Sequence, residues 1–253
     1  MNKKHYASLF IFFGLIALIF AQFKPVAFTA GLATPRIPVL MFHYVRHVDP
    51  KKDLLGYNLS IEPERFEEIM KYLKQNKYQT IHAQDILSNS KKLPSRPIIL
   101  TFDDGYKDFY ITAWPILKKY QLTASVAIIS DKMDDKQYMS SENLKEIYKD
   151  GIEVLSHTVN HVDLSKSKNA KFEITKSKTA LEKLLGTKIE GFVYPAGKYN
   201  SSTIELLKNA GYKFAFTTKP GLADLNFNGD MFTLRRIRVD NRTSLKGLIS
   251  RLP

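Results

Sequence analysis

Continuous apolar stretches that alternate with amphipathic segments constrain the fold of this chain most strongly. Residues 97–102 (PIILTF) and 124–129 (ASVAII) carry few polar side chains, as strands buried on both faces of a parallel sheet do. Between such stretches, residues 62–76 and 169–186 repeat apolar side chains every three or four positions, which predicts helices. Further strands are expected at 38–45, 78–81, 152–156, 191–195, 213–218 and 233–239. A short helix that ends at Leu87 is expected after the strand at 78–81, and another helix at 112–120. The alternation predicts an α/β protein, and about seven strands in roughly 215 residues suit a distorted or incomplete β/α barrel better than an open sheet.

The first two dozen residues have the composition of an export segment. Lys3 and Lys4 precede an uncharged apolar run from Tyr6 to Phe23, which is the layout of a signal peptide or a membrane anchor. As a helix this run would span roughly 27 Å, close to the thickness of a hydrocarbon core. We therefore expect a signal peptide or N-terminal membrane anchor at 1–24, a linker at 25–36 and a folded domain at 37–253. The protein is then expected at the outer face of the cell membrane, or secreted if the segment is cleaved.

Charge and cysteine content limit the partners of the domain. The formal net charge is +13 with lysines spread along the chain, which fits a solvated basic surface or attraction to an anionic cell envelope. The sequence has no dense arginine and lysine block, so nucleic acid is not an expected partner. It has no cysteine, which excludes disulfides and thiolate metal ligands. We expect a monomer.

Residue types that perform chemistry follow, or interrupt, five of the predicted strands. The carboxyl ends of parallel strands meet at one rim, and sites in parallel α/β folds are assembled there. The sequence therefore predicts one functional site at this rim. Its candidate residues, in chain order, are His43, Asp103 and Asp104, His157 and His161, Pro195–Gly197, and Arg235 with Arg236.

The histidine pair and the aspartate pair together indicate a metal site. His157 and His161 are four residues apart, so on a helical turn both imidazoles would face one ion. A nearby aspartate would complete a site of two histidines and one carboxylate, which suits Zn²⁺ or another divalent ion that keeps an open position. One of Asp103 and Asp104 would then be neutralised by the metal, and the other would stay free as a general base. The alternatives are a turn capped by an aspartate and ordinary surface histidines.

Three motifs, in this order and at this spacing, resemble the polysaccharide deacetylases, the fourth family of carbohydrate esterases. They are TFDDGY, SHTVNH and FVYPAG, and the resemblance covers Pro38 to Pro253. It implies a distorted β/α barrel, a divalent metal that is commonly zinc (Co²⁺ or Ni²⁺ would also suit the site), and hydrolysis of the acetamide of N-acetylglucosamine polymers. By motif position, Asp103 would be the catalytic base, and Asp104, His157 and His161 the metal ligands.

The general acid departs from the usual family pattern. Most members have a histidine near the carboxyl end in a Leu-x-His motif, whereas this chain ends in LISRLP. The stretch LMFHYV is similar instead to the branch that acts on poly-β-1,6-N-acetylglucosamine, where a histidine on the first strand supplies the acid. The resemblance therefore implies that His43 is the general acid. The alternative is a histidine at a strand end that is satisfied by backbone groups.

The third motif, FVYPAG, also differs from the usual family pattern. Many members have RxPYG where this chain has VYPAG, so Val193 and Ala196 stand at the arginine and tyrosine positions. The resemblance implies that the backbone N–H of Ala196 still donates to the oxyanion. Arg236, or otherwise Arg238, would replace the missing arginine in orienting Asp103, although both could be ordinary surface charges.

The substrate is expected to be a glycan. Tyr106 and Tyr199 are candidates for stacking on sugar rings, although aromatic residues more often belong to the core. The expected function is metal-dependent removal of N-acetyl groups from poly-β-1,6-N-acetylglucosamine. The alternatives are deacetylation of peptidoglycan N-acetylglucosamine, which would use the same catalytic residues, and a catalytically retired, membrane-tethered glycan-binding protein.

Overall fold

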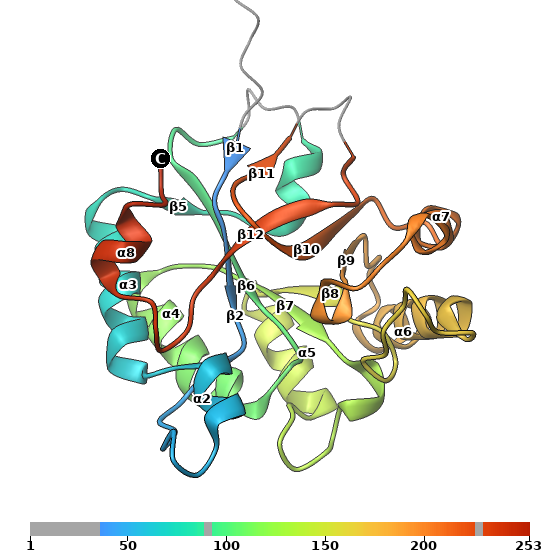
Figure 1. Cartoon of the computed structure of the whole chain (residues 1–253), viewed down its shortest axis with the longest axis horizontal. Coiled ribbons are helices and arrows are strands. Elements are labelled where there is room, and N and C mark those ends of the chain that lie inside the picture. Colours follow the sequence, from blue (N-terminus) through green and yellow to red (C-terminus); the bar gives the residue numbers. More distant parts are fainter. Residues whose placement is uncertain (1–35, 89–92, 226–229) are drawn as a thin grey trace, which may run out of the picture. The chain divides into compact units, whose positions relative to one another are not determined.

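Seven parallel strands close into a barrel in the computed structural model, which describes residues 36–88, 93–225 and 230–253 (Figure 1). Around the barrel the order is β2-β12-β10-β9-β8-β7-β6, and β6 pairs with β2 to close it. The strands are β2 (Val39–Phe42), β6 (Pro97–Phe102), β7 (Ser125–Ile128), β8 (Glu153–Ser156), β9 (Gly191–Val193), β10 (Phe214–Pro220) and β12 (Leu234–Arg238). The predicted β/α barrel is confirmed, with one strand fewer than a complete eight-stranded barrel. The predictions for residues 1–24 and for 25–35 of the linker lie outside the described residues.

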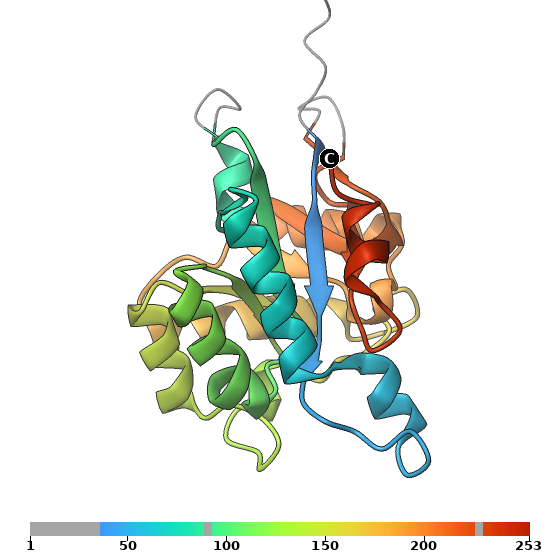
Figure 2. The ribbon, with the colours of Figure 1, turned by 90° about the vertical axis from the view of Figure 1, so that its left-hand side faces the viewer.

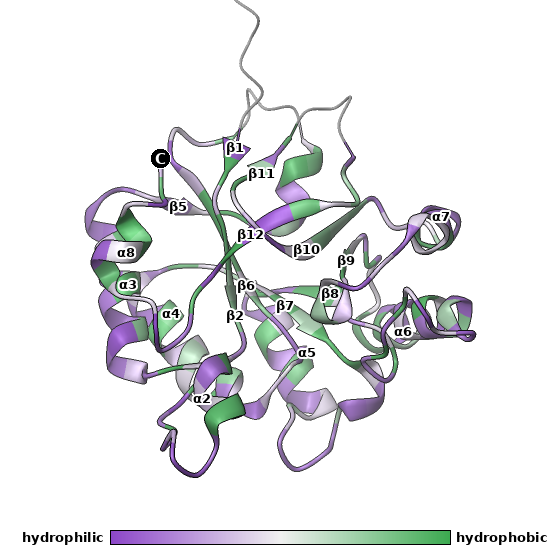
Figure 3. Ribbon diagram, in the orientation of Figure 1, coloured by the Kyte–Doolittle hydropathy of each residue, from purple (hydrophilic) through white to green (hydrophobic). Residues whose placement is uncertain are grey.

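Helices surround the barrel. They are α2 (Leu54–Leu59), α3 (Pro63–Gln75), α4 (Trp114–Tyr120), α5 (Ser141–Lys149), α6 (Ala170–Leu185), α7 (Ser201–Asn209) and α8 (Leu245–Ile249). The predicted apolar face of α3, formed by Phe66, Ile69, Met70 and Leu73, is buried. In the turned view α3 and α8 lie on either side of β2 (Figure 2). The central strands are mostly hydrophobic, whereas the helices carry both kinds of residue (Figure 3).

Alternate strand residues enter two different apolar clusters, as the two-residue period of a strand requires. In β6, Ile99 belongs to one cluster, and its neighbours Ile98 and Leu100 belong to the other. The first cluster, here called the barrel core, contains Val39, Ile99, Ala127, Leu155, Val193, Phe214, Phe216 and Leu234, so that every barrel strand contributes to it. The second packs the strands against the helices.

Short elements complete the two ends of the barrel. The 3₁₀ helix η1 (Ala83–Leu87) places Ala83 and Ile86 in the barrel core at the amino-terminal end of the strands, where a short helix was expected. The short strand β5 (Gln79–Thr80) pairs with β6 outside the barrel. A two-stranded pair, β1 (Arg36–Ile37) with β11 (Ala223–Asp224), is antiparallel.

Two predicted elements are divided in the structure. The predicted strand 38–45 ends at Phe42 and resumes after His43 as β3 (Tyr44–Val45), which pairs with β4 (Ser60–Ile61). The predicted helix 112–120 is preceded by a π-helical turn, η3 (Phe109–Ala113), and Pro115 lies in the first turn of α4, where a missing N–H costs least. Within the described ranges, the helices are all too short or too polar to cross a membrane.

Candidate active site

Every second residue of a barrel strand points into the barrel. This alternation fills the barrel core with apolar side chains and also directs polar side chains inward at the carboxyl ends of the strands. Asp103 lies four residues after Ile99, and His157 lies two residues after Leu155, so each continues the inward series of its strand. His43 continues the series of Val39 in the same way. The predicted rim site is therefore a consequence of strand geometry.

Three side chains form a cluster that could hold a metal ion. Oδ1 of Asp104 lies 3.3 Å from Nε2 of His157 and 3.4 Å from Nε2 of His161. One potential ligand atom from each residue lies within 4.8 Å of the others, and in the part of the chain that the structure describes this is the one such group of three. Asp104 and His157 are buried, whereas the side chain of His161 is 39% exposed, so the cluster opens to solvent on one side.

The donor set fits a cation. Nδ1 of His157 lies 2.7 Å from the carbonyl oxygen of Val193, to which it donates as N–H, and this leaves the lone pair of Nε2 directed at the cluster. Oδ1 of Asp104 is buried without a hydrogen-bond partner among the described residues, and an orphaned carboxylate oxygen is costly unless a positive charge meets it.

Burial and the neighbouring charges shift the pKa values of the two histidines in opposite directions. Burial alone would lower the pKa of His157, but Asp104 and Asp103 outweigh it and raise the pKa, so the site favours positive charge at this ring. Burial, together with His157, lowers the pKa of His161 and favours the neutral imidazole that metal binding requires.

The prediction of a helical turn for the histidine pair was wrong. Residues 157–161 form a loop in which Thr158 and His161 have φ of +67° and +58°, and the His161 N–H donates to Oγ1 of Thr158 at 2.9 Å. Asp104 is also left-handed, with φ of +75°. Aspartate and histidine tolerate this region better than most residues, yet each such position costs on the order of 1 kcal/mol. The strained backbone therefore coincides with two of the three candidate ligands.

The left-handed turn at Asp104 makes the side chains of the two adjacent aspartates face different partners. Asp104 faces the histidines, whereas Asp103 faces Arg236, whose Nη1 and Nη2 lie 2.7 and 2.8 Å from its two oxygens. Arg236 is fully buried and also donates to Thr217 O and to Thr101 Oγ1. Burial tends to raise the pKa of Asp103, but the charge and hydrogen bonds of Arg236 hold that pKa well below its usual range. The contact expected from Arg236 is thus present, while Arg238 pairs with Asp240 instead.

Removing Arg236 is expected to destabilise the fold through Asp103. Arg236→Met leaves a buried carboxylate without its cation, and the free energy of unfolding of the metal-free protein should fall by about 3–5 kcal/mol. The double variant Arg236→Met with Asp103→Asn removes both charges and should recover a large part of that loss. Denaturant unfolding of the three proteins measures this difference, and a single variant no less stable than the double variant would contradict the expectation.

His43 lies on the other side of Asp103. Its Nε2 is 3.8 Å from Oδ2 of Asp103, and its side chain is 15% exposed. Burial lowers the pKa of His43 from 6.5, because it outweighs the attraction of Asp103 and Asp104. The lowered pKa favours the neutral ring, so His43 must take up a proton before it can donate one. The geometry therefore permits a proton acceptor and a proton donor side by side.

The side chain of Asp108 forms a hydrogen bond with the segment that follows His43. Its Oδ2 accepts a hydrogen bond from the N–H of Val45 in β3. Burial raises the pKa of Asp108 from 3.8 to about 6, despite the opposing effect of this hydrogen bond. Asp108 therefore links β3 to the loop that begins with the two aspartates.

This raised pKa predicts a pH dependence of stability. Between about pH 4 and pH 6 the folded state binds the proton of Asp108 more tightly than the unfolded state, so the free energy of unfolding falls as the pH rises, by up to about 3 kcal/mol. Asp108→Asn can still accept from Val45 but does not ionise. The stability of the wild type minus that of the variant, measured by denaturant unfolding without metal, should decrease over this interval. Parallel curves for the two proteins would show that Asp108 does not titrate as described.

Ala196 lies in a tight turn after β9, in the 3₁₀ element η5 (Pro195–Gly197). It is exposed and has φ of +50°, and Gly197 follows with φ of +67°. A Cβ at Gly197 would approach Oγ1 of Thr218 to 2.1 Å, so only glycine fits there. The turn starts two residues after Val193, whose carbonyl holds His157. The oxyanion role of the Ala196 N–H stays a prediction.

Both tyrosines singled out from the sequence have ring faces covered by neighbours. Tyr106 lies between Tyr44 and Tyr138, with ring centroids 3.7 and 5.0 Å away. Tyr199 stacks on Tyr194 at 4.6 Å, and its hydroxyl lies 2.8 Å from Nζ of Lys219. Each ring therefore has at least one face in contact with another tyrosine, and the role of both residues in binding a sugar stays a prediction.

Tyr138 is a residue that the sequence did not single out. It reaches Tyr106 because residues 105–107 and 137–139 run side by side, with Lys107 N–H donating to Gln137 O at 2.9 Å and Met139 N–H to Gly105 O at 3.0 Å. Neither segment carries a strand pattern that would signal this pairing.

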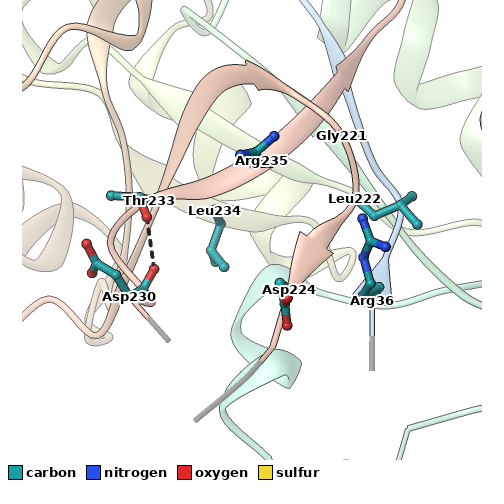
Figure 4. Close-up of a pocket in the computed structure, with 8 residues that line it drawn as sticks. All are labelled: Arg36, Gly221, Leu222, Asp224, Asp230, Thr233, Leu234 and Arg235. Carbon is teal, nitrogen blue, oxygen red and sulfur yellow. Dashed lines mark hydrogen bonds between the residues drawn. The ribbon is translucent and has the colours of Figure 1, made fainter. Parts of the chain in front are cut away.

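A separate cavity of about 420 Å³ shares no residue with the cluster. It lies where β1, the turn between β10 and β11, and the start of β12 meet (Figure 4). It contains both acidic and basic side chains and no histidine, so it lacks the donor set of the rim site. The lining residues are Arg36, Gly221, Leu222, Asp224, Asp230, Thr233, Leu234 and Arg235.

Comparison with known proteins identifies the family. The model of the family described as polysaccharide deacetylase matches residues 90–215. YxkH of Bacillus subtilis (strain 168), which is named after the same family, is 32% identical over 209 residues, covering 81% of this chain and 71% of that protein. The poly-β-1,6-N-acetyl-D-glucosamine N-deacetylase of Staphylococcus aureus (strain MRSA252) is 29% identical over 189 residues, covering 68% of this chain and 65% of that protein.

A solved structure agrees with these sequence matches. The deacetylase PplD of Streptococcus pyogenes, solved in complex with acetate, has a TM-score of 0.81 and 29% identity, and covers 87% of this chain and 99% of that one. The barrel, its motifs and these relatives agree with one another. The chain belongs to the polysaccharide deacetylase family and is a deacetylase.

Proposed function

We propose that this deacetylase removes N-acetyl groups from N-acetylglucosamine residues of a polymer of the poly-β-1,6-N-acetylglucosamine type. The observation that carries the proposal is His43, which directly follows the first barrel strand, β2, with its Nε2 3.8 Å from the Asp103 carboxylate. An acid at this position would serve the leaving amine from the side of Asp103. The Staphylococcus aureus relative, which is named for this polymer, supports the same substrate class.

The proposal includes a divalent metal, with Zn²⁺ as the first candidate. Asp104, His157 and His161 would hold it, because two imidazoles and one carboxylate with an open side suit zinc, and Co²⁺ or Ni²⁺ accept similar donors. When bound, such an ion polarises an acetamide carbonyl and lowers the pKa of a water molecule.

The remaining chemistry belongs to side chains and backbone groups of this chain. Asp103, kept ionised and oriented by Arg236, accepts the proton of the attacking water. The Ala196 N–H donates to the oxyanion of the tetrahedral intermediate. His43 delivers a proton to the amine as the carbon–nitrogen bond breaks, because an unprotonated amine leaves poorly. The products are acetate and a glucosamine residue.

A comparison of two substrates tests the proposal. Purified protein is supplied with Zn²⁺ and given β-1,6-linked N-acetylglucosamine oligomers or β-1,4-linked peptidoglycan fragments, and acetate and free amine are measured together. We expect equal amounts of both products and a higher kcat/KM for the β-1,6 oligomers. A higher kcat/KM for peptidoglycan fragments would favour the wall-polymer alternative. Glycan binding without acetate, with metal present, would favour a binding protein.

We also propose that residues 1–24 take the protein out of the cytoplasm and that the catalytic domain acts at the outer face of the membrane or in the medium. The apolar run after Lys3 and Lys4 supports this location. Protease added to intact cells should degrade the domain, or the domain should be found in the medium. A domain that is protected until the cells are lysed would contradict the proposal.

A further inference from the structure

Two of the three candidate metal ligands depend on one irregular loop. Residues 157–161 carry His157 and His161, and Thr158 and His161 in this loop are left-handed. A loop with such strain keeps its shape only where its surroundings fix it. The positions of both imidazoles therefore depend on what holds the loop.

The side chain of Glu173, on α6, forms hydrogen bonds with the middle of the 157–161 loop. Oε2 of Glu173 accepts from the N–H groups of Val159 and Asn160 at 3.0 and 2.9 Å. Oε1 accepts from Nδ2 of Asn160 at 3.0 Å. Glu173 is only 4% exposed, so these three donors replace the water that its carboxylate would otherwise bind. Hydrogen bonds to an ionised acceptor are stronger than neutral ones.

The helix that carries Glu173 is itself fixed to the strand that leads into the loop. Ser177 lies one turn further along the same face of α6, and its Oγ is 2.9 Å from Oγ of Ser156, the residue before His157. In the segment after β7, the N–H groups of Ser130 and Asp131 donate to the carbonyl oxygens of Thr158 and Val159. The 157–161 loop is thus hydrogen-bonded both to α6 and to the segment after β7.

We propose that Glu173 is a positioning residue for the metal centre, which holds the 157–161 loop in the shape that lets His157 and His161 meet Asp104. The inference rests on the proposed metal-dependent function. Groups behind the ligands of a metal site typically change metal affinity by about 10–100-fold when they are removed. Glu173 contacts neither the ion nor the substrate in this account, and its effect passes through the backbone of Val159 and Asn160.

Metal affinity tests this role without an activity assay. Dissociation constants for Zn²⁺ and Co²⁺ are measured by competition with a chromophoric chelator, together with the visible spectrum of bound Co²⁺ and the thermal unfolding of the metal-free protein. Glu173→Ala should bind both ions about 10–100-fold more weakly and change the Co²⁺ spectrum. Glu182→Ala is the matched control, because Glu182 lies on the same helix but accepts from Ile189. It should leave the affinity and the spectrum unchanged.

Two conservative variants separate positioning from general stability. Glu173→Gln keeps an acceptor for both backbone N–H groups, and the Asn160 amide can turn to present its oxygen, so most of the affinity should return. Glu173→Asp keeps the charge but is one methylene shorter, so it should bind metal at least about 10-fold more weakly. If Glu173→Ala does not fold, the metal affinity of Glu173→Asp tests the positioning role instead.

Wild-type affinity in a folded Glu173→Ala or Glu173→Asp variant would overturn the positioning role and leave the metal site standing. A wild-type protein that binds neither ion would overturn the metal site and this role together. Weaker binding in those variants with recovery in Glu173→Gln would support the role.

Discussion

Replacing Asp103 by asparagine is expected to lower kcat by about 10²–10⁴-fold, the range that a positioned general base contributes. The variant keeps the size of the side chain and one acceptor for Arg236, but it cannot accept a proton from water. The metal ligands are untouched, so Zn²⁺ affinity should change little. Initial rates of acetate release at saturating substrate, with bound zinc measured in parallel, give the result.

The matched control for this variant is Asp240→Asn. Asp240 is also buried and also paired with arginines, since Arg238 and Arg242 lie 3.0 and 2.6 Å from its Oδ2, but it is not part of the cluster. We expect it to keep near wild-type turnover, with some loss of stability. Near wild-type turnover in Asp103→Asn would remove Asp103 from the role of base.

Replacing His157 by alanine is expected to remove both metal binding and turnover. His157 is a fully buried candidate ligand, and its ring is fixed by the hydrogen bond to the Val193 carbonyl. Loss of a Lewis acid worth several kcal/mol corresponds to roughly 10³-fold or more in rate. A chelator should inactivate the wild type equally, and added Zn²⁺ should restore the wild type but not the variant.

His47→Ala controls for the general loss of a histidine. The side chain of His47 is 67% exposed and pairs with Glu64 at 3.3 Å, and surface pairs of this kind contribute little. The variant should bind zinc and turn over as the wild type does. An active His157→Ala variant that still binds one zinc per chain would place the metal elsewhere.

The barrel and most of the rim site could be predicted because both follow from the two-residue period of buried strands. Once 97–102 is recognised as a strand, the inward series fixes the direction of Asp103, and the same reasoning places His43 and His157. Adjacent carboxylates at a strand end already require a cation or a turn, and the structure contains both. Arg236 faces Asp103, and a left-handed turn at Asp104 leads away from it.

What could not be predicted depends on contacts between distant segments. In the 157–161 loop the N–H groups of Val159 and Asn160 donate to Glu173 on the following helix, and nothing in the spacing of the two histidines signals this contact. Tyr138 reaches Tyr106 through the pairing of two loops without strand patterns. The choice of Arg236 over Arg238 was made from the sequence, but only the structure shows that Arg238 reaches Asp240 beyond the strand end.

The most direct test of the central claim is a metal titration of deacetylase activity. Protein stripped with a chelator is titrated with Zn²⁺, and acetate release from β-1,6-linked N-acetylglucosamine oligomers is measured at each step. We expect no activity without metal, a linear rise in rate with added zinc, and a plateau at one zinc per chain that is lost in His157→Ala. Full activity in the stripped protein, or no acetate from a protein that holds one zinc, would contradict the central claim.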